Sequence, residues 1–341
     1  MRWISLSILF LLIAATLVGA HLASLYHKEL LEPLALEQEE VFLVRPGQSF
    51  REIAGEMAEL GWLNHPWLVE AHARYHGIAD RLQAGEYAVP ADITMARLLD
   101  HMARGLVVRH RLTVPEGWTA QQFLDAVQAH PALRPVPDPG DLEQVMGALG
   151  HTDLHPEGWF LPDTYVFSRD TAALQLLRMA HEAMVSELDR AWQTRIENHP
   201  LESSYQLLIL ASIIEKETGQ AQERELVAGV FVNRLRQGMR LQTDPTLLYP
   251  LGPGANRLTR AELQRDHAYN TYTRDGLPPT PIALPGRASI RAAANPAETD
   301  ALFFVSRKDG THEFSRTYAE HRAAVIKYQL DGDASRYGRR P

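Results

Sequence analysis

The segment YQLLILASIIEKETG ends in two carboxyl groups, Glu215 and Glu217. It is apolar on nearly every side through Ile214, so we expect a buried helix that stops at Gly219. Burial and the partial negative charge at a helix C-terminus both favour a neutral carboxylic acid over its anion. An acid held in this way can act as a general acid near neutral pH. The alternative is a solvated last turn, the commoner setting for a Glu-Lys pair at a helix end.

Helical phase distinguishes the two glutamates. Glu215 shares a face with Ala211 and Ser212, one turn earlier, whereas Glu217 follows two isoleucines. Small residues beneath Glu215 would leave room for a substrate, so Glu215 is the candidate catalytic residue. Ser212 and Glu217 are candidates for contact with the substrate, although Glu217 also suits a structural role.

Two downstream segments are rich in amide, hydroxyl and aromatic side chains: FVNRLRQGMRLQTDPTLLY and AYNTYTRDGLPPTPIALPG. Such side chains suit sugar rings, which offer hydroxyl groups at the edge and flat apolar faces. Asp244 before Pro245 could instead cap a turn, and the tyrosines could belong to the core. The further substrate-binding candidates are Asn233, Gln242, Thr243, Asp244, Tyr269, Asn270, Thr271 and Tyr272.

Other chemistries have weaker support. The chain has no cysteine, which excludes disulfides, thiol catalysis and cysteine-bound zinc. His151, Asp153 and His155 alternate in a loop that is more simply solvated than metal-binding. Ser203 and Ser204 lack a Gly-x-Ser-x-Gly elbow, and no glycine-rich phosphate motif occurs. With a net charge of -8 and interspersed charges, the chain has no basic face for nucleic acid. We therefore expect no metal, no cofactor and no nucleic-acid partner.

Residues 3–26 contain no Lys, Arg, Asp or Glu. As a helix they would span roughly 36 Å, enough for a hydrocarbon core of about 30 Å. We expect a single membrane anchor, because the apolar run exceeds the 7–15 residues or so of a signal peptide. Small residues at 18–20 or 21–23 keep a cleaved signal peptide as the alternative. Arg2 precedes the run and five glutamates at 29–40 follow it, so the positive-inside rule puts the N-terminus in the cytoplasm.

The remaining 300 or so residues are too many for one core of ordinary size. Residues 28–40 indicate an acidic stalk, followed by a strand, two helices and a strand, with a capping box at Ser49 and Glu52. A related half-motif restarts at TVPEGWTAQQFLDAV, with Thr119 as the capping residue. The proline-rich stretch at 131–141 is the best candidate for a domain boundary. Long helices are expected to begin at Ala172 and at Tyr205.

Five blocks resemble the signature of the YceG-like family of endolytic murein transglycosylases. They are EGWFLPDTYVF, LASIIEKET, FVNRLRQGMRLQTDPTLLY, YNTYTRDGLPPTPIALPG and AAANPAETDALFFV, in the family's order over roughly residues 40–330. Residues 121–156 match no pattern of this kind.

The resemblance implies an α+β fold with an N-terminal transmembrane helix, a LysM-like module and a mixed α/β catalytic domain. Together with the patterns in the residues, it predicts domains at 1–27 (anchor), 28–40 (stalk), 41–110 (LysM-like module), 111–156 (second small α+β region and linker) and 157–330 (catalytic domain). The composition after residue 330 predicts a disordered tail at 331–341.

For function, the resemblance implies that Glu215 is the acid/base in cleavage of peptidoglycan glycan strands to 1,6-anhydromuramyl ends. The catalytic domain would be periplasmic, anchored in a bacterial inner membrane, with glycan-polymerising penicillin-binding proteins as partners. The alternatives are a non-catalytic peptidoglycan-binding scaffold, based on the LysM-like residues 41–110, and hydrolysis in place of transglycosylation.

Overall fold

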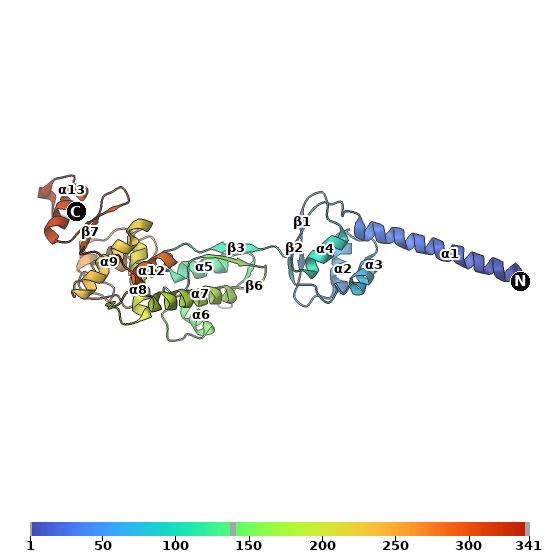
Figure 1. Cartoon of the computed structure of the whole chain (residues 1–341), viewed down its shortest axis with the longest axis horizontal. Helices are drawn as coiled ribbons and strands as arrows, with labels where there is room; N and C mark the ends of the chain where they lie inside the picture. The colour runs from blue at the N-terminus through green and yellow to red at the C-terminus, as the bar shows by residue number, and fades with distance from the viewer. Residues whose placement is uncertain (1, 137–140, 338–341) are drawn as a thin grey trace. The chain divides into compact units, whose positions relative to one another are not determined.

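A computed structural model describes residues 2–136 and 141–337 of the chain, coloured in Figure 1. It confirms a mixed α+β protein whose strands form short two-stranded sheets. The chain divides into two compact units: unit 1 comprises Met1–His110 and Val166–Thr171, and unit 2 comprises Arg111–Tyr165 and Ala172–Pro341.

The N-terminal apolar run forms the helix α1 (Arg2–Tyr26), continued by one π-helical turn, η1 (His27–Leu31). The stretch Leu6–Leu31 is long and apolar enough to cross a membrane, and its most apolar window is not buried against the protein. An unburied helix differs from the core helix of a soluble protein. A signal sequence at this position would have the same properties, so both predicted alternatives remain.

Unit 1 has the predicted order of strand, helix, helix and strand. Its elements are β1 (Glu40–Val44), α2 (Phe50–Glu59), α3 (Pro66–Tyr75), β2 (Gly85–Val89) and α4 (Met95–Ala103). The strands pair antiparallel with Glu40 opposite Val89. The predicted capping box of α2 is confirmed, because Ser49 and Glu52 bond each other's backbone N–H groups.

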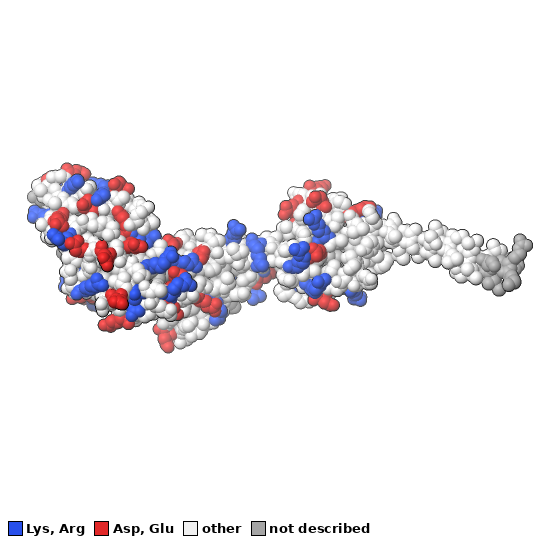
Figure 2. Space-filling model, in the orientation of Figure 1, with Lys and Arg blue, Asp and Glu red and all other residues white. Residues whose placement is uncertain are grey.

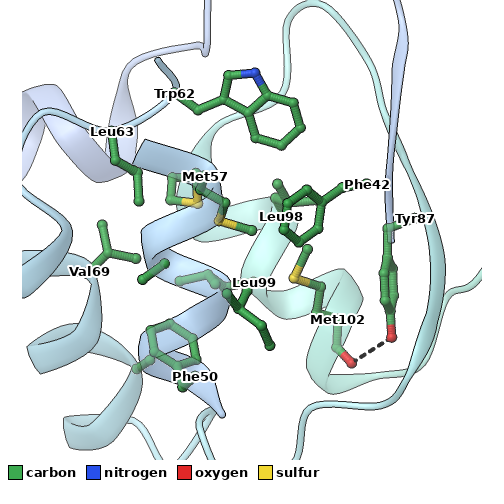
Figure 3. Packing of buried hydrophobic residues seen from close by; sticks show 14 of the residues in the cluster. Phe42, Phe50, Met57, Trp62, Leu63, Val69, Tyr87, Leu98, Leu99 and Met102 are labelled. Carbon is green, nitrogen blue, oxygen red and sulfur yellow. Dashed lines mark hydrogen bonds between the residues drawn. The ribbon is translucent and has the colours of Figure 1, made fainter. Parts of the chain in front are cut away.

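The core of unit 1 is almost wholly apolar (Figure 3). Side chains from α2 and α4, among them Met57, Leu98 and Leu99, pack beneath Phe42 of β1. Tyr87 is the polar exception, and its hydroxyl donates to the carbonyls of Gln83 (2.6 Å) and Met102 (3.2 Å). Tyr87 therefore adds no unpaired polar group to the core.

Residues 28–40, predicted as an acidic stalk, make contacts with unit 1. Leu30 is fully buried in the unit 1 core, and the Glu29 carboxylate lies 2.8 Å from His65 Nδ1. Leu34 N–H donates to the carbonyl of Ile93 at 2.9 Å. The acidic composition suggested solvation, but these side chains and backbone groups have partners distant in the sequence.

Unit 2 is built mainly from helices. Its elements are β3 (His110–Thr113), α5 (Ala120–Ala129), β4 (Leu133–Arg134), α6 (Leu142–Leu149), β5 (Thr164–Phe167), β6 (Thr171–Ala172), α7 (Ala173–Gln193), α8 (Ser204–Glu217), η2 (Ala221–Glu223), α9 (Arg224–Arg236), α10 (Asp244–Leu248), η3 (Tyr249–Leu251), α11 (Arg260–Gln264), α12 (Arg287–Ala294), β7 (Phe303–Ser306), β8 (His312–Ser315), α13 (Tyr318–Gln329) and η4 (Ala334–Arg336). The ends of β3, β5 and β6 lie where the chain passes between the units.

The centre of unit 2 is α8, against which α7, α9, α10 and α12 pack. All eight residues from Leu207 to Ile214 are buried, as the sequence predicted. Residues 111–156, predicted as a separate small region, group with the later helices because α5 and α6 pack within unit 2.

Residues 137–140, within the predicted proline-rich boundary, and 338–341, within the predicted tail, lie outside the described residues. The rest of the tail includes the short helix η4, and its disorder stays a prediction. On the face shown in Figure 2, positive and negative residues are interspersed over both units, whereas the part of α1 drawn in white carries neither.

Candidate active site

The helix α8 places Glu215 at its last turn. Ser203 caps the start of the helix by accepting a hydrogen bond from the backbone N–H of Gln206. The helix then runs through the core and ends at Glu217. Only 7% of the Glu215 side chain is exposed, so the predicted solvated last turn does not apply to this carboxyl group.

One oxygen of Glu215 is held by the start of α12. Glu215 Oε2 accepts hydrogen bonds from the backbone N–H of Gly286 (2.9 Å) and from the hydroxyl of Ser289 (2.7 Å). The other oxygen, Oε1, lies 3.9 Å from the guanidinium of Arg224. The two donors on Oε2 fix the orientation of the carboxyl group, so that Oε1 points toward the Arg224 guanidinium.

A turn far upstream in the sequence also reaches this carboxyl group. Gly117 donates its N–H to the carbonyl of Leu284 (2.9 Å), and Leu284 returns a bond to the carbonyl of Trp118 (2.7 Å). Lys216 Nζ donates to the Gly117 carbonyl at 3.2 Å. Gly117 has φ +77°, a left-handed conformation that glycine adopts without strain. The turn at 116–118 is thereby joined to both α8 and the segment before α12.

The same turn carries a second carboxyl group, Glu116, which is exposed to solvent. A β-carbon built on Gly286 would lie 1.8 Å from Glu116 Oε1, so the Glu116 carboxyl group lies directly against Gly286. Partial loss of hydration raises the pKa of Glu116, as does the charge of Glu215, whereas Arg224 and Arg287 lower it. Two carboxyl groups therefore flank Gly286, one bonded to its N–H and one against its Cα.

A third carboxyl group, Glu157, lies deeper. It is 4% exposed and accepts hydrogen bonds from the N–H of Ala120 (2.9 Å) and the hydroxyl of Tyr249 (3.1 Å). Burial raises the pKa of Glu157 to about 7, against the opposing effect of these hydrogen bonds and of the charge of Lys216. Glu157 thus links the start of α5 to Tyr249, and it lies close enough to Lys216 for that positive charge to lower its pKa.

Several predicted substrate-binding residues meet in one polar network beyond the end of α8. Glu217 accepts a hydrogen bond from the Thr243 hydroxyl, and burial raises its pKa. The backbone N–H of Thr243 donates to Thr271 Oγ1 at 3.1 Å. In the same network Gln242, with φ +48°, donates its N–H to the Thr271 carbonyl, and the hydroxyl of Tyr272 donates to Asp244.

Four of these candidates are interior groups rather than exposed ones. Ser212 is fully buried, accepting from the N–H of Ile282 (3.0 Å) and donating to the carbonyl of Ile209. Asn270 is also fully buried, and its amide donates to the carbonyl of Arg265 at 2.8 Å. Thr243 and Thr271 are 2% exposed. The space that small residues were expected to leave beneath Glu215 is filled at Ser212 by the 281–284 segment.

Asn233 and Tyr269 lie outside the network around Glu217. The Asn233 amide donates to the carbonyls of Thr299 (2.7 Å) and Ala301 (3.2 Å), and this residue lines a hollow of about 470 Å³ beside α9. Tyr269 packs 5.4 Å from the ring of Tyr249, on the side of the site where Glu157 lies. Among the described residues, no cluster of His, Asp or Glu side chains has the arrangement of a metal site.

Sequence reasoning did not identify four residues around Glu215, nor the buried carboxyl group of Glu157: the four are Glu116, Arg224, Gly286 and Ser289. The signals for two of them were present. Glu116 lies in the restarted half-motif TVPEGWT, and Glu157 opens the block EGWFLPDTYVF. Ser289 and Gly286 follow a proline-rich turn, and only the folded chain shows that they face Glu215.

A buried, hydrogen-bonded carboxyl group at a helix end, with a second carboxyl group beside it, is an arrangement suited to acid/base chemistry. The model of the YceG-like family matches residues 42–327. The chain belongs to the YceG-like family, which confirms the resemblance seen in the sequence.

Known relatives are similar along most of the chain. A protein of Bacillus subtilis (strain 168) named endolytic murein transglycosylase is 29% identical over 325 residues, covering 90% of each chain. A protein of the same name from Streptococcus pneumoniae is 28% identical, covering 83% of this chain and 57% of its own length. The crystal structure of a YceG-like protein of Listeria monocytogenes is 30% identical, with a TM-score of 0.53, over 84% of this chain and 99% of that one.

Proposed function

We propose that this protein is an endolytic murein transglycosylase with Glu215 as its acid/base. It is a lytic transglycosylase that acts on peptidoglycan, in keeping with the names of its relatives. The finer proposal is cleavage of the β-1,4 bond between N-acetylmuramic acid and N-acetylglucosamine in nascent glycan strands. The observation that carries it is the Glu215 carboxyl group, fixed by Gly286 and Ser289 at the end of a buried helix.

The chemistry requires one proton to be given and one to be taken. Glu215 in its acid form protonates the glycosidic oxygen as the bond to the muramyl C1 breaks. The muramyl C6 oxygen then bonds to C1, and its proton passes to the Glu215 carboxylate. The muramyl ring closes on itself as a 1,6-anhydro end, no water is consumed, and Glu215 recovers its starting form.

The remaining parts of the chain fit this role. Residues Leu6–Leu31 would hold the protein in the inner membrane with its N-terminus in the cytoplasm and its catalytic unit in the periplasm. A tether of this kind keeps the site near strands that are still being polymerised, which would let cleavage terminate their elongation. Residues 41–110 would act as a LysM-like glycan-binding module, and penicillin-binding proteins that polymerise glycan are the expected partners.

The test is product analysis with the full chain in detergent and uncrosslinked glycan strands as substrate. Wild-type protein should release 1,6-anhydromuramyl ends, which mass spectrometry separates from hydrolytic ends because the latter are heavier by one water. Glu215→Gln should fold and release none. Glu225→Gln, which changes an exposed carboxyl group on the neighbouring helix α9, is the matched control and should be fully active.

Two results would refute the proposal. Undiminished product from Glu215→Gln would remove Glu215 from the mechanism. Glycan binding without cleavage by the wild-type chain would favour a non-catalytic scaffold instead.

A further inference from the structure

The carboxyl group of Glu116 has no part in the mechanism above, yet it lies beside Glu215. Both groups contact Gly286: Glu215 accepts its N–H at 2.9 Å, and Glu116 Oε1 lies 1.8 Å from where its β-carbon would be. With standard bond lengths, these distances put the two carboxyl oxygens at most about 7 Å apart. The paired carboxyl groups of glycosidases are separated by about 5 to 9.5 Å.

The position of Glu116 is fixed by backbone contacts. Its neighbours Gly117 and Trp118 exchange hydrogen bonds of 2.9 and 2.7 Å with Leu284, and Lys216 donates to the Gly117 carbonyl. The carboxyl group is nevertheless exposed. The fixed backbone sets where this side chain begins, and its exposed carboxyl group is available to a ligand.

The charged groups around Glu116 act on its pKa in both directions. The negative charge of Glu215 raises the pKa of Glu116, whereas Arg224 and Arg287 lower it. When Glu215 carries the proton that it must donate, its negative charge no longer raises the pKa of Glu116. Partial loss of hydration still raises that pKa, and the two arginines lower it and so favour the Glu116 carboxylate.

We propose that Glu116 is a second catalytic carboxyl group, whose negative charge stabilises the positive charge that develops at the muramyl C1 while Glu215 transfers the protons. This inference rests on the proposed function. Glu116 forms no covalent bond and exchanges no proton, so the balance of the reaction is unchanged. Its ligand is the oxocarbenium-like sugar ring of the transition state.

Residue 286 offers a way to move the Glu116 carboxyl group. Gly286 has φ -75°, a conformation open to any residue, so alanine would not strain the backbone here. A β-carbon at residue 286 would overlap the Glu116 carboxyl group, which is the end of an exposed side chain and can shift. A methyl group at residue 286 would push the carboxyl group away without removing its charge.

The experiment measures kcat and KM for uncrosslinked glycan with the full chain in detergent. Glu116→Gln should lower kcat by about 100-fold with KM within about twofold, as expected when a group that acts only on the transition state is lost. Glu116→Asp should recover part of the loss. Gly286→Ala should lower kcat by about 10-fold or more, and Glu143→Gln, an exposed carboxyl change on α6, should change neither constant.

A kcat for Glu116→Gln above half the wild-type value, or a rise in KM alone, would overturn the proposal. Thermal unfolding of each variant separates loss of fold from loss of catalysis, and Gly286→Ala, which keeps the charge, provides a second route if Glu116→Gln unfolds. Wild type and Glu215→Gln are assayed in parallel, so that the proposed function is tested separately from the role of Glu116. If they differ as predicted while Glu116→Gln is fully active, the proposed function stands and only the role of Glu116 fails.

Discussion

The two units bury different kinds of side chain. The core of unit 1 is a cluster of aliphatic, aromatic and methionine side chains, with Tyr87 contributing one satisfied hydroxyl. Its two buried carboxyl groups, Glu29 and Glu86, are each paired with a basic side chain. Unit 2 buries more charged and polar side chains, among them Glu157, Glu187, Arg234, Thr243 and Asn270. Apolar packing needs only shape and volume, whereas each buried charge needs a partner and opposes folding without one. Perturbed titratable groups concentrate at functional sites, and unit 2, which holds more of the buried polar groups, is where Glu215 lies.

The largest expected effect is on the stability of unit 1. Leu99→Ala empties a fully buried position on α4 and should destabilise the unit by about 2–5 kcal/mol. Hydrogen exchange of peptides from residues 41–110 should show the loss, while cleavage per folded molecule stays the same. The control is Leu60→Ala, at an exposed position of the same unit, with an expected change within about 0.5 kcal/mol. Equal losses from both variants would contradict a packing core.

The second effect depends on pH and belongs to unit 2. Burial raises the pKa of Glu157 from 4.5 to about 7, so the folded chain holds this proton more tightly than the unfolded chain. The resulting loss of stability is absent below about pH 4.5, grows as the pH rises, and is complete above about pH 7, where it amounts to roughly 3 kcal/mol. Glu157→Gln stays neutral at every pH.

The melting temperature of Glu157→Gln should therefore gain on that of the wild type between pH 5 and pH 8. Glu143→Gln, at an exposed site, should run parallel to the wild type throughout. If the melting temperature of Glu157→Gln also ran parallel to that of the wild type, Glu157 would not titrate differently in the folded and unfolded chain over this range. Its burial would then carry no pH-dependent cost to the stability of unit 2.

The smallest effect concerns one hydrogen bond to Glu215. Ser289→Ala removes the 2.7 Å donor to Oε2 but leaves the Gly286 N–H. We expect kcat to fall about 10-fold, equivalent to about 1.4 kcal/mol, with little change in KM. Ser186→Ala, at an exposed position on α7, is the control. An unchanged kcat for Ser289→Ala would mean that the orientation of the carboxyl group does not limit the rate.

Local features of both units could be predicted from the sequence. The capping boxes at Ser49 and Thr119, the limits of α8 to within one residue, and the burial of α8 follow from residues a few positions apart. Side-chain periodicity and capping are short-range properties, so one sequence contains them in full. The burial of Leu30, within the segment predicted as a stalk, depends on partners tens of residues away.

The arrangement of the site depends on such distant partners. Glu116, Glu215 and Gly286 come together from three segments separated by 99 and 71 positions, and no local pattern indicates that they meet. Ser212 shows the opposite error. Its small side chain suggested open space, but the space under a small residue is filled by whatever segment packs there, here 281–284. Phase on a helix gives a side chain's direction, not its neighbours.

Unit 1 includes residues 166–171 as well as the N-terminal stretch, and this has a consequence for synthesis. Glu86 on β2, 7% exposed, is bonded by His110 and by Arg169. A ribosome that has made the first 110 residues has supplied one of these two partners, and the other follows only after residues 111–165. The first unit to begin folding is therefore completed late, and a protein truncated at residue 110 would carry a half-paired buried carboxylate.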